Sequence, residues 1–548
     1  MKRRLLFGSF YSALVLIVAG ACGAQEDAAG VGGDPGGSWG DPGNSGTGGT
    51  TQGEGPLPPE EELEEDFEVP AAVGRYLWAA NPKSNRVVLV DATTLGVEVL
   101  EAGFAPTYLA GIPPVGDFPG GAVVINERSD DATIFRLPSD EDSPVSAETV
   151  TVHSVPVHPR ANAWRVGPKS RFAIAWSDAR AFSRVDPTEG LQDLTVIDLD
   201  GDEPVSTRLS AGYRPSQVVV EESGKRAYVV SQPGITVLHL THADGPRVER
   251  ELFLPEEAGD QARDVSITPD GAFAFVRMAG ESSVLIVDLA SDERITVDLP
   301  APVTDLDVSA DGTKAVAVMR TPTEPAAGAA GAPAATEPSR IAVLPLDTIV
   351  TDPEDYEIHE LDGLFGSAVL SQDGRYALAF TNAVASPLLA IVDLETGEHR
   401  ELDLRAPVRA AFLLEDGSHA VVLLTPPAGS ARRGAFSLVP VAADLPPKME
   451  GTDAPTRFVS LSSDPPRALV TTVGAEDEPH DVLLARFPGL QVDRIRLAST
   501  PLASGVVPEA GKGFVAQSHP EGRVTFVGLE DGAAQVLTGF ELGGKVVE

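Results

Sequence analysis

The stretch SITPDGAFAFV, residues 266–276, sets two short apolar runs on either side of a turn that ends in Asp-Gly. In Thr268-Pro269-Asp270-Gly271, Pro stands second and Gly fourth, as a type I hairpin turn favours. The same arrangement returns in DVSADGTKAVAV (307–318), VLSQDGRYALAF (369–380) and FLLEDGSHAVVL (412–423). The recurrence predicts a fold built from repeated units that each contain this hairpin.

One unit can be followed in full over residues 263–301. After the hairpin come VLIVDL from Val284 and ERITVDLP from Glu293, which predict a third and a fourth strand. Aligning the turn glycine, or the residue in its place, gives ten such units, and most of the spacings between them are 41 to 49 residues. The aligned residues are Gly74, Gly121, Ser170, Gly224, Gly271, Gly312, Gly374, Gly417, Pro466 and Gly511. A four-stranded meander of this length is typical of a propeller blade.

The third and fourth strands of the units differ in pattern. Third strands such as LTVIDL from Leu194 and LAIVDL from Leu389 are almost continuously apolar, which indicates cover on both faces. Fourth strands such as EHRELDLR (398–405) interleave charged and apolar residues, which suits an outer edge. We therefore predict an all-β β-propeller of about ten four-stranded antiparallel blades.

The sequence is compatible with one ring or with two. No linker divides the units into two groups, because the Ala/Pro-rich stretch 321–339 falls between the second and third strands of one unit. One large ring is favoured, with two smaller rings as the alternative. The first unit shows no clear innermost strand, and FELGGKVVE (540–548) is a candidate to supply it.

The first unit also carries a resemblance. YLWAANPKSNRVVLVDATTLGVEVLEAGFAPTYLAGI, residues 76–112, resembles the YVTN-type (WD40-like) surface propeller repeat, with Asn81, Asp91, Thr94, Gly103 and Pro106 matching in order. The resemblance implies a β-propeller in an extracytoplasmic setting. It implies no chemistry, because the matching residues are turn and strand positions and propellers serve many functions.

The N-terminal sequence predicts that the protein is located in the cell envelope. Residues 1–21 combine a basic start, an apolar run and small residues before Cys22, as a secretory signal peptide does. Ala19-Gly20-Ala21-Cys22 resembles the bacterial lipobox, although Ala19 replaces the usual leucine, and this implies lipidation of Cys22, the only cysteine. By the family's sorting rule, Gly23 after the cysteine implies the outer membrane, with the domain facing the periplasm or the outside.

The remaining domain boundaries follow from composition. Residues 22–72 form a Gly/Ser/Pro-rich tether that ends in the acidic run EEELEEDFE (60–68), which we interpret as a solvated spacer, with cation or partner binding as the alternative. Residues 73–548 form the propeller. A net charge of −40 argues against nucleic acid as a partner.

The long loops of the units predict where binding occurs. Stretches starting at Ser177, Thr425 and Val473, together with 321–339, are expected on the face that also carries the connections between blades. The alternative is that these long loops are unselected insertions, which a chain tolerates at low cost. The predicted function is that of a binding or scaffold module for protein or glycan partners in the cell envelope, with no cofactor. The alternative is an enzyme with a site in the central channel, such as a lactonase-like hydrolase or a quinone- or metal-dependent oxidoreductase.

Residues for such chemistry are few. No catalytic residue is assigned; Asp264 and Asp305, with Asp307 nearby, are candidates to converge on a cation from adjacent units. The histidine pairs His153/His158 and His239/His242 fit no metal motif and are expected on surfaces or loops, and strand alternation is expected to point His239 and His242 to opposite faces. DLDGDE (198–203) departs from the calcium-loop pattern and predicts a polar turn.

Overall fold

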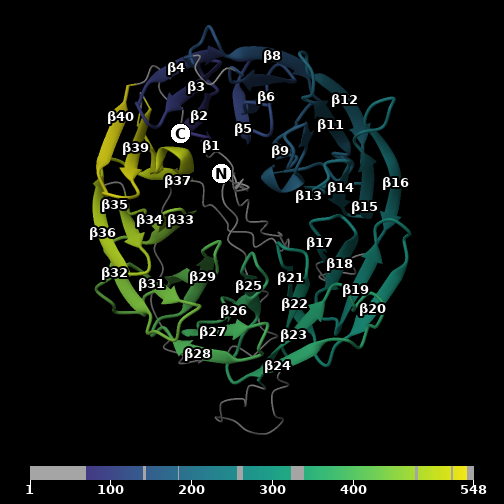
Figure 1. Cartoon of the computed structure of the whole chain (residues 1–548), viewed down its shortest axis with the longest axis vertical. Helices are drawn as coiled ribbons and strands as arrows, with labels where there is room; N and C mark the ends of the chain where they lie inside the picture. Colours follow the sequence, from purple (N-terminus) through teal and green to yellow (C-terminus); the bar gives the residue numbers. More distant parts are fainter. Residues whose placement is uncertain are drawn as a thin grey trace, which may run out of the picture.

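The computed structural model describes residues 70–139, 144–182, 184–255, 263–321, 338–475, 479–519 and 522–539. The expected signal peptide, Cys22, the acidic run 60–68 and the C-terminal residues 540–548 lie outside these ranges. Ten separate sheets of four antiparallel strands follow one another around a ring, and each sheet takes its strands in chain order (Figure 1). The prediction of one ten-bladed propeller is confirmed.

The innermost strands are β1 (Ala71–Val73), β5 (Pro106–Ile112), β9 (Ala163–Val166), β13 (Gln217–Val220), β17 (Arg263–Ile267), β21 (Val303–Val308), β25 (Ser367–Leu370), β29 (Val408–Leu413), β33 (Thr456–Ser463) and β37 (Pro501–Val507). The second strands are β2 (Tyr76–Asn81), β6 (Gly121–Asn126), β10 (Phe172–Trp176), β14 (Arg226–Ser231), β18 (Phe273–Met278), β22 (Lys314–Met319), β26 (Tyr376–Phe380), β30 (His419–Leu424), β34 (Pro466–Thr472) and β38 (Lys512–Gln517).

The third strands are β3 (Arg86–Asp91), β7 (Asp131–Arg136), β11 (Asp193–Asp198), β15 (Gly234–His239), β19 (Ser283–Asp288), β23 (Ser339–Pro345), β27 (Leu388–Asp393), β31 (Gly434–Pro440), β35 (His480–Arg486) and β39 (Arg523–Gly528). The outermost strands are β4 (Val97–Glu101), β8 (Thr151–Pro156), β12 (Val205–Ser210), β16 (Arg247–Phe253), β20 (Arg294–Asp298), β24 (Glu357–Leu361), β28 (His399–Asp403), β32 (Lys448–Thr452), β36 (Gln491–Leu497) and β40 (Ala534–Thr538). Two short 3-10 helices, η1 (Ala179–Ala181) and η2 (Pro508–Ala510), complete the described elements.

The core lies between neighbouring blades, as the apolar third strands predicted. In β19, Val284, Ile286 and Val287 are fully buried. One apolar cluster joins Phe275 of the fifth blade to Ala315 of the sixth, and similar clusters join other adjacent blades. Each blade therefore buries both faces of its sheet against its neighbours, and the ring is held by sheet-on-sheet packing.

The Asp-Gly turns join the first and second strands of the blades. Gly271 has a φ of 69° and donates its N–H to the carbonyl of Thr268, with an N to O distance of 2.8 Å. This left-handed conformation explains the glycine at the fourth place of the turn. Two of the aligned positions differ: Gly121 is the first residue of β6 and Pro466 is the first residue of β34, so neither is a turn residue.

The ring closes between the first and tenth blades. β1 supplies the innermost strand of the first blade, so the expectation that this unit lacks one was wrong; the strand has only three residues and no alternating pattern. It begins at Ala71, two residues before the expected start of the propeller. Leu77 and Val88 pack against Phe514 and Phe526 of the tenth blade, so apolar contacts close the ring among the described residues.

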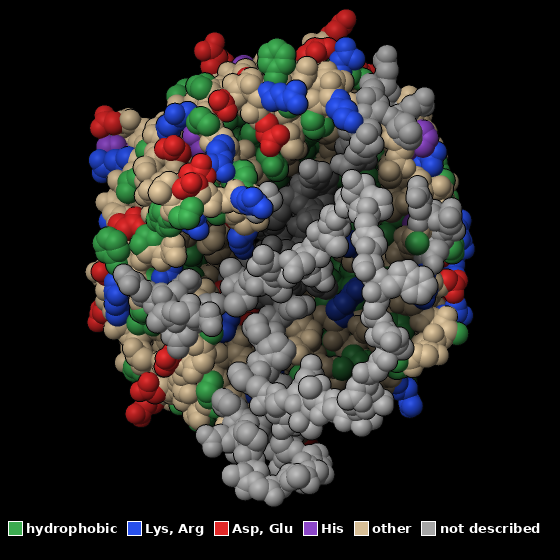
Figure 2. Space-filling view, turned by 180° about the vertical axis from the view of Figure 1, so that it is seen from behind, with side chains coloured by type: hydrophobic (Ala, Val, Ile, Leu, Met, Phe, Trp, Pro, Cys, Tyr) green, Lys and Arg blue, Asp and Glu red, His purple; other side chains and the backbone are tan. Residues whose placement is uncertain are grey.

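The strand order gives the propeller two distinct faces. The connections between blades and the loops between second and third strands lie on one face, which we call the connection face. The turns between first and second strands and between third and fourth strands lie on the other, which we call the turn face. β22 ends at Met319 and β23 begins at Ser339, so the stretch 321–339 joins a second to a third strand as expected; residues 322–337 lie outside the described ranges. Figure 2 shows charged side chains of both signs over the blades around a central hollow. In the described part of the chain, no helix is long and apolar enough to cross a membrane.

Candidate functional site: the connection face and the channel carboxylates

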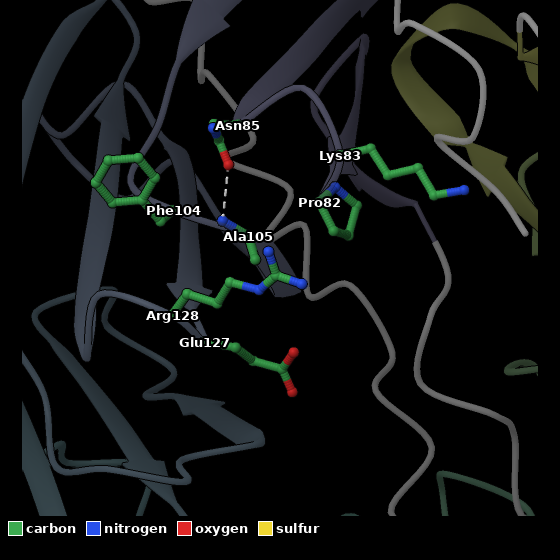
Figure 3. Close-up of a pocket in the computed structure, with 7 residues that line it drawn as sticks. All are labelled: Pro82, Lys83, Asn85, Phe104, Ala105, Glu127 and Arg128. Atoms are coloured by element: carbon green, nitrogen blue, oxygen red, sulfur yellow. Dashed lines mark hydrogen bonds between the residues drawn. The ribbon is translucent and has the colours of Figure 1, made fainter.

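A hollow on the connection face lies at the junction of the first and second blades (Figure 3). It has a volume of about 470 Å³, and its lining residues come from two strand-joining loops and one blade connection: Pro82, Lys83, Asn85, Phe104, Ala105, Glu127 and Arg128. Asn85 Oδ1 accepts the backbone N–H of Ala105, with an N to O distance of 2.9 Å. This bond fixes the loop of one blade to the connection that leads into the next.

The side chains at this hollow suit recognition of another molecule. Phe104 is 64% exposed, which is unusual for a phenylalanine, and Lys83 and Arg128 are exposed beside it. Glu127 adds one carboxylate. An aromatic ring flanked by cations offers an apolar contact and charge-assisted hydrogen bonds at one place, as the central residues of binding surfaces often do.

The connection next to this hollow is a corner that the chain builds more than once. The N–H of Gly103 donates to Thr133 Oγ1 in β7 over 3.1 Å, and the N–H of Gly212 donates to Thr236 Oγ1 in β15 over 2.9 Å. A Cβ at Gly103 would lie 2.5 Å from the side-chain amide of Asn126. Close packing at the corner therefore explains the glycine at position 103, one of the residues that carry the resemblance.

His158 stands at the equivalent corner between the second and third blades. Its backbone N–H donates to Thr195 Oγ1 over 3.0 Å, as at the two glycine corners. Ser177 follows β10 at the place that Asn126 takes in the second blade, and the smaller residue leaves room for the imidazole. His158 lies in the connection between β8 and β9, so the expectation of a surface or loop histidine is met by its position in a loop, but the side chain is buried, with 1% exposed.

The hydrogen bonds of His158 define its chemistry. Nδ1 lies 2.9 Å from Thr195 Oγ1 and Nε2 lies 3.2 Å from Ser177 Oγ. The Ser177 hydroxyl donates to the carbonyl of Arg160 over 2.9 Å, so we assign the proton between the ring and Ser177 to Nε2. Burial lowers the pKa of His158 to about 4. The histidine is neutral and does not activate Ser177 as a nucleophile.

A second hollow of about 280 Å³ opens beside this corner, on the same face. Glu189 and Asp193 line it together with His158 and Arg160. Arg160 pairs with Glu189 over 2.6 Å and lies over the ring of Phe182. Two neighbouring blade junctions thus carry hollows with charged and aromatic side chains, and this group of residues is the candidate binding site.

The channel carboxylates Asp305 and Asp307 project from β21, the innermost strand of the sixth blade. Asp305 Oδ2 accepts the N–H of Ala368 over 2.8 Å, and Asp307 accepts the N–H of Leu370. Thr304 adds a bond to the carbonyl of Gly366 over 2.8 Å. These side chains therefore satisfy the inner edge of β25 in the seventh blade, which no fifth strand covers among the described residues.

The environment of these carboxylates disfavours their charge. Burial raises the pKa of Asp305 to about 6, against the attraction of Arg277. Burial and the neighbouring Asp305 raise the pKa of Asp307 to about 7. Asp264, 3% exposed on β17, lies 3.6 Å from Arg277 Nη2, and burial raises its pKa as well.

A cation site at these residues gains no support from their geometry. Asp264 faces Arg277, and Asp305 faces backbone N–H groups, so both candidates contact positive or donor groups. Within the described ranges, no three His, Cys, Asp or Glu side chains are grouped to hold a metal ion.

Two other sequence expectations can be compared with the structure. The rings of His239 and His242 meet edge to face with centroids 5.5 Å apart, so the expectation of opposite faces was wrong. β15 ends at His239, and the alternation rule does not extend into the turn beyond it. Residues 198–203 form the expected polar turn, where Asp198 pairs with Arg171 over 3.0 Å.

The comparisons with known proteins concern the fold. No family model and no curated protein matches the chain. Among solved structures, the dihydro-heme d1 dehydrogenase NirN in complex with DHE is 16% identical, covers 71% of this chain and 84% of its own, and has a TM-score of 0.38. A eukaryotic initiation factor is 12% identical, with 76% and 93% covered and a TM-score of 0.49. The β-propeller domain of Swd1 from Myceliophteria thermophila is 14% identical, with 58% and 94% covered and a TM-score of 0.31. At these identities the likeness concerns the fold alone.

Proposed function

We propose that this chain is a lipid-anchored β-propeller of the cell envelope, similar to YVTN-type surface proteins, whose connection face binds a protein or glycan partner. The observation that carries the proposal is the exposed ring of Phe104 beside Lys83 and Arg128, at the edge of a hollow. The signal-like residues 1–21 and Cys22 support the envelope address, with attachment through the lipidated cysteine to the outer membrane.

The geometry supports binding over chemistry in the channel. Asp305 and Asp307 already accept backbone N–H groups of β25, and Ser177 donates its proton to a carbonyl. A general acid or nucleophile needs a group that can reach a substrate and exchange a proton with it. These residues instead take part in hydrogen bonds that join neighbouring blades or fix a corner.

Photo-crosslinking in the source cells tests the proposal. A benzophenone amino acid replaces Phe104, which is 64% exposed, or Val205, which is 62% exposed at the turn-face end of the outer strand β12. We expect one discrete crosslinked product from position 104 and none of the same mass from position 205. Equal products from both positions, or none from position 104, would overturn the assignment of the binding face.

The identity of the crosslinked partner separates the two macromolecular classes. A product that protease removes and glycosidase leaves unchanged is a protein complex, and the reverse pattern is a glycan complex. Without crosslinking, Phe104→Asp should lower the amount of this partner recovered in complex with the chain about tenfold, because a central aromatic residue commonly contributes about 1–3 kcal/mol to binding. Val205→Asp, the matched exposed control, should leave recovery unchanged.

A further inference from the structure

The innermost strand of the third blade carries a charge in apolar surroundings. Arg165 stands in β9, which lies on the inside of the ring (Figure 1). The strands with the most extensive contacts to β9 are β5, β10 and β13, and none of the three contains a charged residue. The acids that follow β10 and β13 are engaged elsewhere, because Asp178 pairs with Arg180 over 2.7 Å and Glu221 accepts the Tyr228 hydroxyl over 3.3 Å. Arg165 therefore has no counter-ion on the strands that surround it.

The alternation of β9 fixes the direction of this side chain. Trp164 and Val166 pack against the apolar cluster between the second and third blades, whereas Ala163 packs against the cluster between the third and fourth. Neighbouring side chains on a strand point to opposite faces, so Arg165 shares the face of Ala163. Its side chain thus points to the junction of the third and fourth blades, and all four residues of β9 are partly exposed at the inside of the ring.

The guanidinium of Arg165 has no acceptor in the part of the chain that the structure describes. Arginines on two other innermost strands donate to backbone carbonyls: Arg263 to Ser231 O over 2.7 Å and Arg409 to Thr456 O over 2.6 Å. Among the described residues, Arg165 makes no hydrogen bond or ion pair. Burial lowers the pKa of Arg165, and no carboxylate within the described ranges acts against this effect. A charge in such surroundings is unfavourable unless an anion accompanies it.

A second donor without an acceptor lies on the same face of this blade. Trp176 of β10 is 9% exposed, and its Nε1–H is buried and meets no acceptor among the described residues. In the strand register Trp176 stands opposite Ala163, two residues from Arg165, so the indole and the guanidinium are diagonal neighbours on adjacent strands. Residues in this relation are about 7–8 Å apart, within reach of long and aromatic side chains. The two donors can therefore serve one acceptor group.

We propose that the junction of the third and fourth blades binds a small organic monocarboxylate from the channel, through Arg165 and the indole N–H of Trp176. The planar guanidinium can donate two parallel N–H groups to a carboxylate, and the indole adds a third donor. One arginine balances one negative charge, which favours a carboxylate over a phosphate dianion. Ile174, Val218 and Val220 of the apolar cluster at this junction provide surface for the carbon chain of the ligand. This inference stands independently of the proposed partner on the connection face.

Indole NMR of the full-length chain tests the proposal. The chain has four tryptophans, so labelling with nitrogen-15 tryptophan gives four indole signals, and Trp176→Phe identifies the relevant one. The probes are acetate, butyrate, octanoate and benzoate, with benzamide as the neutral analogue of benzoate and inorganic phosphate as a second anion. Arg165→Gln removes the proposed partner of the carboxylate. Arg247→Gln, at an exposed position on the outermost strand β16, is the control with the same change in net charge.

We expect at least one carboxylate to shift the Trp176 signal in a saturable way. Arg165→Gln should weaken this binding by about tenfold or more, because a charge-assisted contact is lost, and Arg247→Gln should bind like the wild type. Arg165→Lys keeps the charge without the planar fork and should have intermediate affinity. The signal of Trp78, which is fully buried in the first blade, reports whether each variant is folded.

Three results would overturn the proposal: no saturable shift with any carboxylate, equal affinity in folded Arg165→Gln, or binding of benzamide as strong as that of benzoate. A shift with phosphate alone would also overturn the assigned ligand class, since the site would then select a phosphate group.

Discussion

Asp305 of β21 accepts a hydrogen bond from the backbone N–H of Ala368 on β25, with an N to O distance of 2.8 Å, so a side chain of the sixth blade satisfies the inner edge of the seventh. Its second oxygen accepts the N–H of Leu306 in its own strand over 2.9 Å. A carboxylate in the channel of a propeller can thus be a structural group between blades.

We predict that Asp305→Ala lowers the free energy of unfolding by about 1–3 kcal/mol, because the N–H of Ala368 loses its acceptor in a buried place. Chemical denaturation of the full chain measures the change. Asp298→Ala, at an exposed position on the outer strand β20, is the control and should change stability by less than about 0.5 kcal/mol. Equal effects of the two variants would show that the hydrogen bond between Asp305 and Ala368 does not contribute to stability.

The raised pKa values of Asp305 and Asp307, about 6 and about 7, predict a pH dependence. The folded protein keeps protons that the unfolded chain releases above about pH 4, so the free energy of unfolding falls as pH rises from about 4 to 7. The double variant Asp305→Asn/Asp307→Asn lacks this contribution. The free energy of unfolding of the wild type minus that of the variant should therefore decline from about pH 4 to pH 7. A difference that stays constant over this range would contradict the raised pKa values of the two carboxyl groups.

His158 predicts the opposite slope. Its folded pKa of about 4 lies below the ordinary value of 6.5, so the unfolded chain takes up a proton that the folded protein excludes. The free energy of unfolding falls as pH falls from about 6.5 to 4, and His158→Gln removes that dependence. Denaturation at several pH values measures it. An NMR titration of the imidazole with a midpoint near 6.5 would argue against the buried, neutral ring.

Gly103→Ala tests the corner between blades. The added Cβ would lie 2.5 Å from the Asn126 amide and 2.8 Å from Asp131 Oδ1, which must move. We expect a loss of about 1–3 kcal/mol in unfolding free energy, as for other overpacked sites. In Gly489→Ala the nearest atom is the Cγ of Gln491 at 3.9 Å, so this control should be close to neutral.

Cys22→Ser tests the anchor. We expect the wild type to incorporate labelled palmitate and to sediment with membranes, and the variant to do neither, because no other cysteine exists in the chain. A wild-type chain recovered unlabelled from the soluble fraction would remove the lipid anchor from the proposed function.

The fold was predictable because its signals are local and repeated. The turn at Gly271 and the third strand from Val284 each depend on a few neighbouring residues, and ten repetitions make the period visible. β1 escaped prediction because three residues show no period. His239 and His242 meet because a turn redirects the chain after the strand ends.

The site depends on contacts between units, which the period does not describe. Asp305 finds Ala368 63 residues later in the chain, across a blade boundary. The only sequence signal for the burial of His158 is its position, because the residues VHPR stand at the corner where other units have glycine. Comparing the corners of the units residue by residue would have singled it out, and the same comparison would have placed Phe104 on the connection.

Each blade in the described ranges is made from one continuous stretch of chain, and β1 belongs to the same sheet as β2, β3 and β4. No blade borrows a strand from the opposite terminus within those ranges. A circularly permuted chain, with its original ends joined and its new ends in any connection between blades, would therefore still consist of whole blades. Duplication or deletion of one repeat would likewise change the circumference by a single blade, which gives evolution a simple route to a ring as wide as this one.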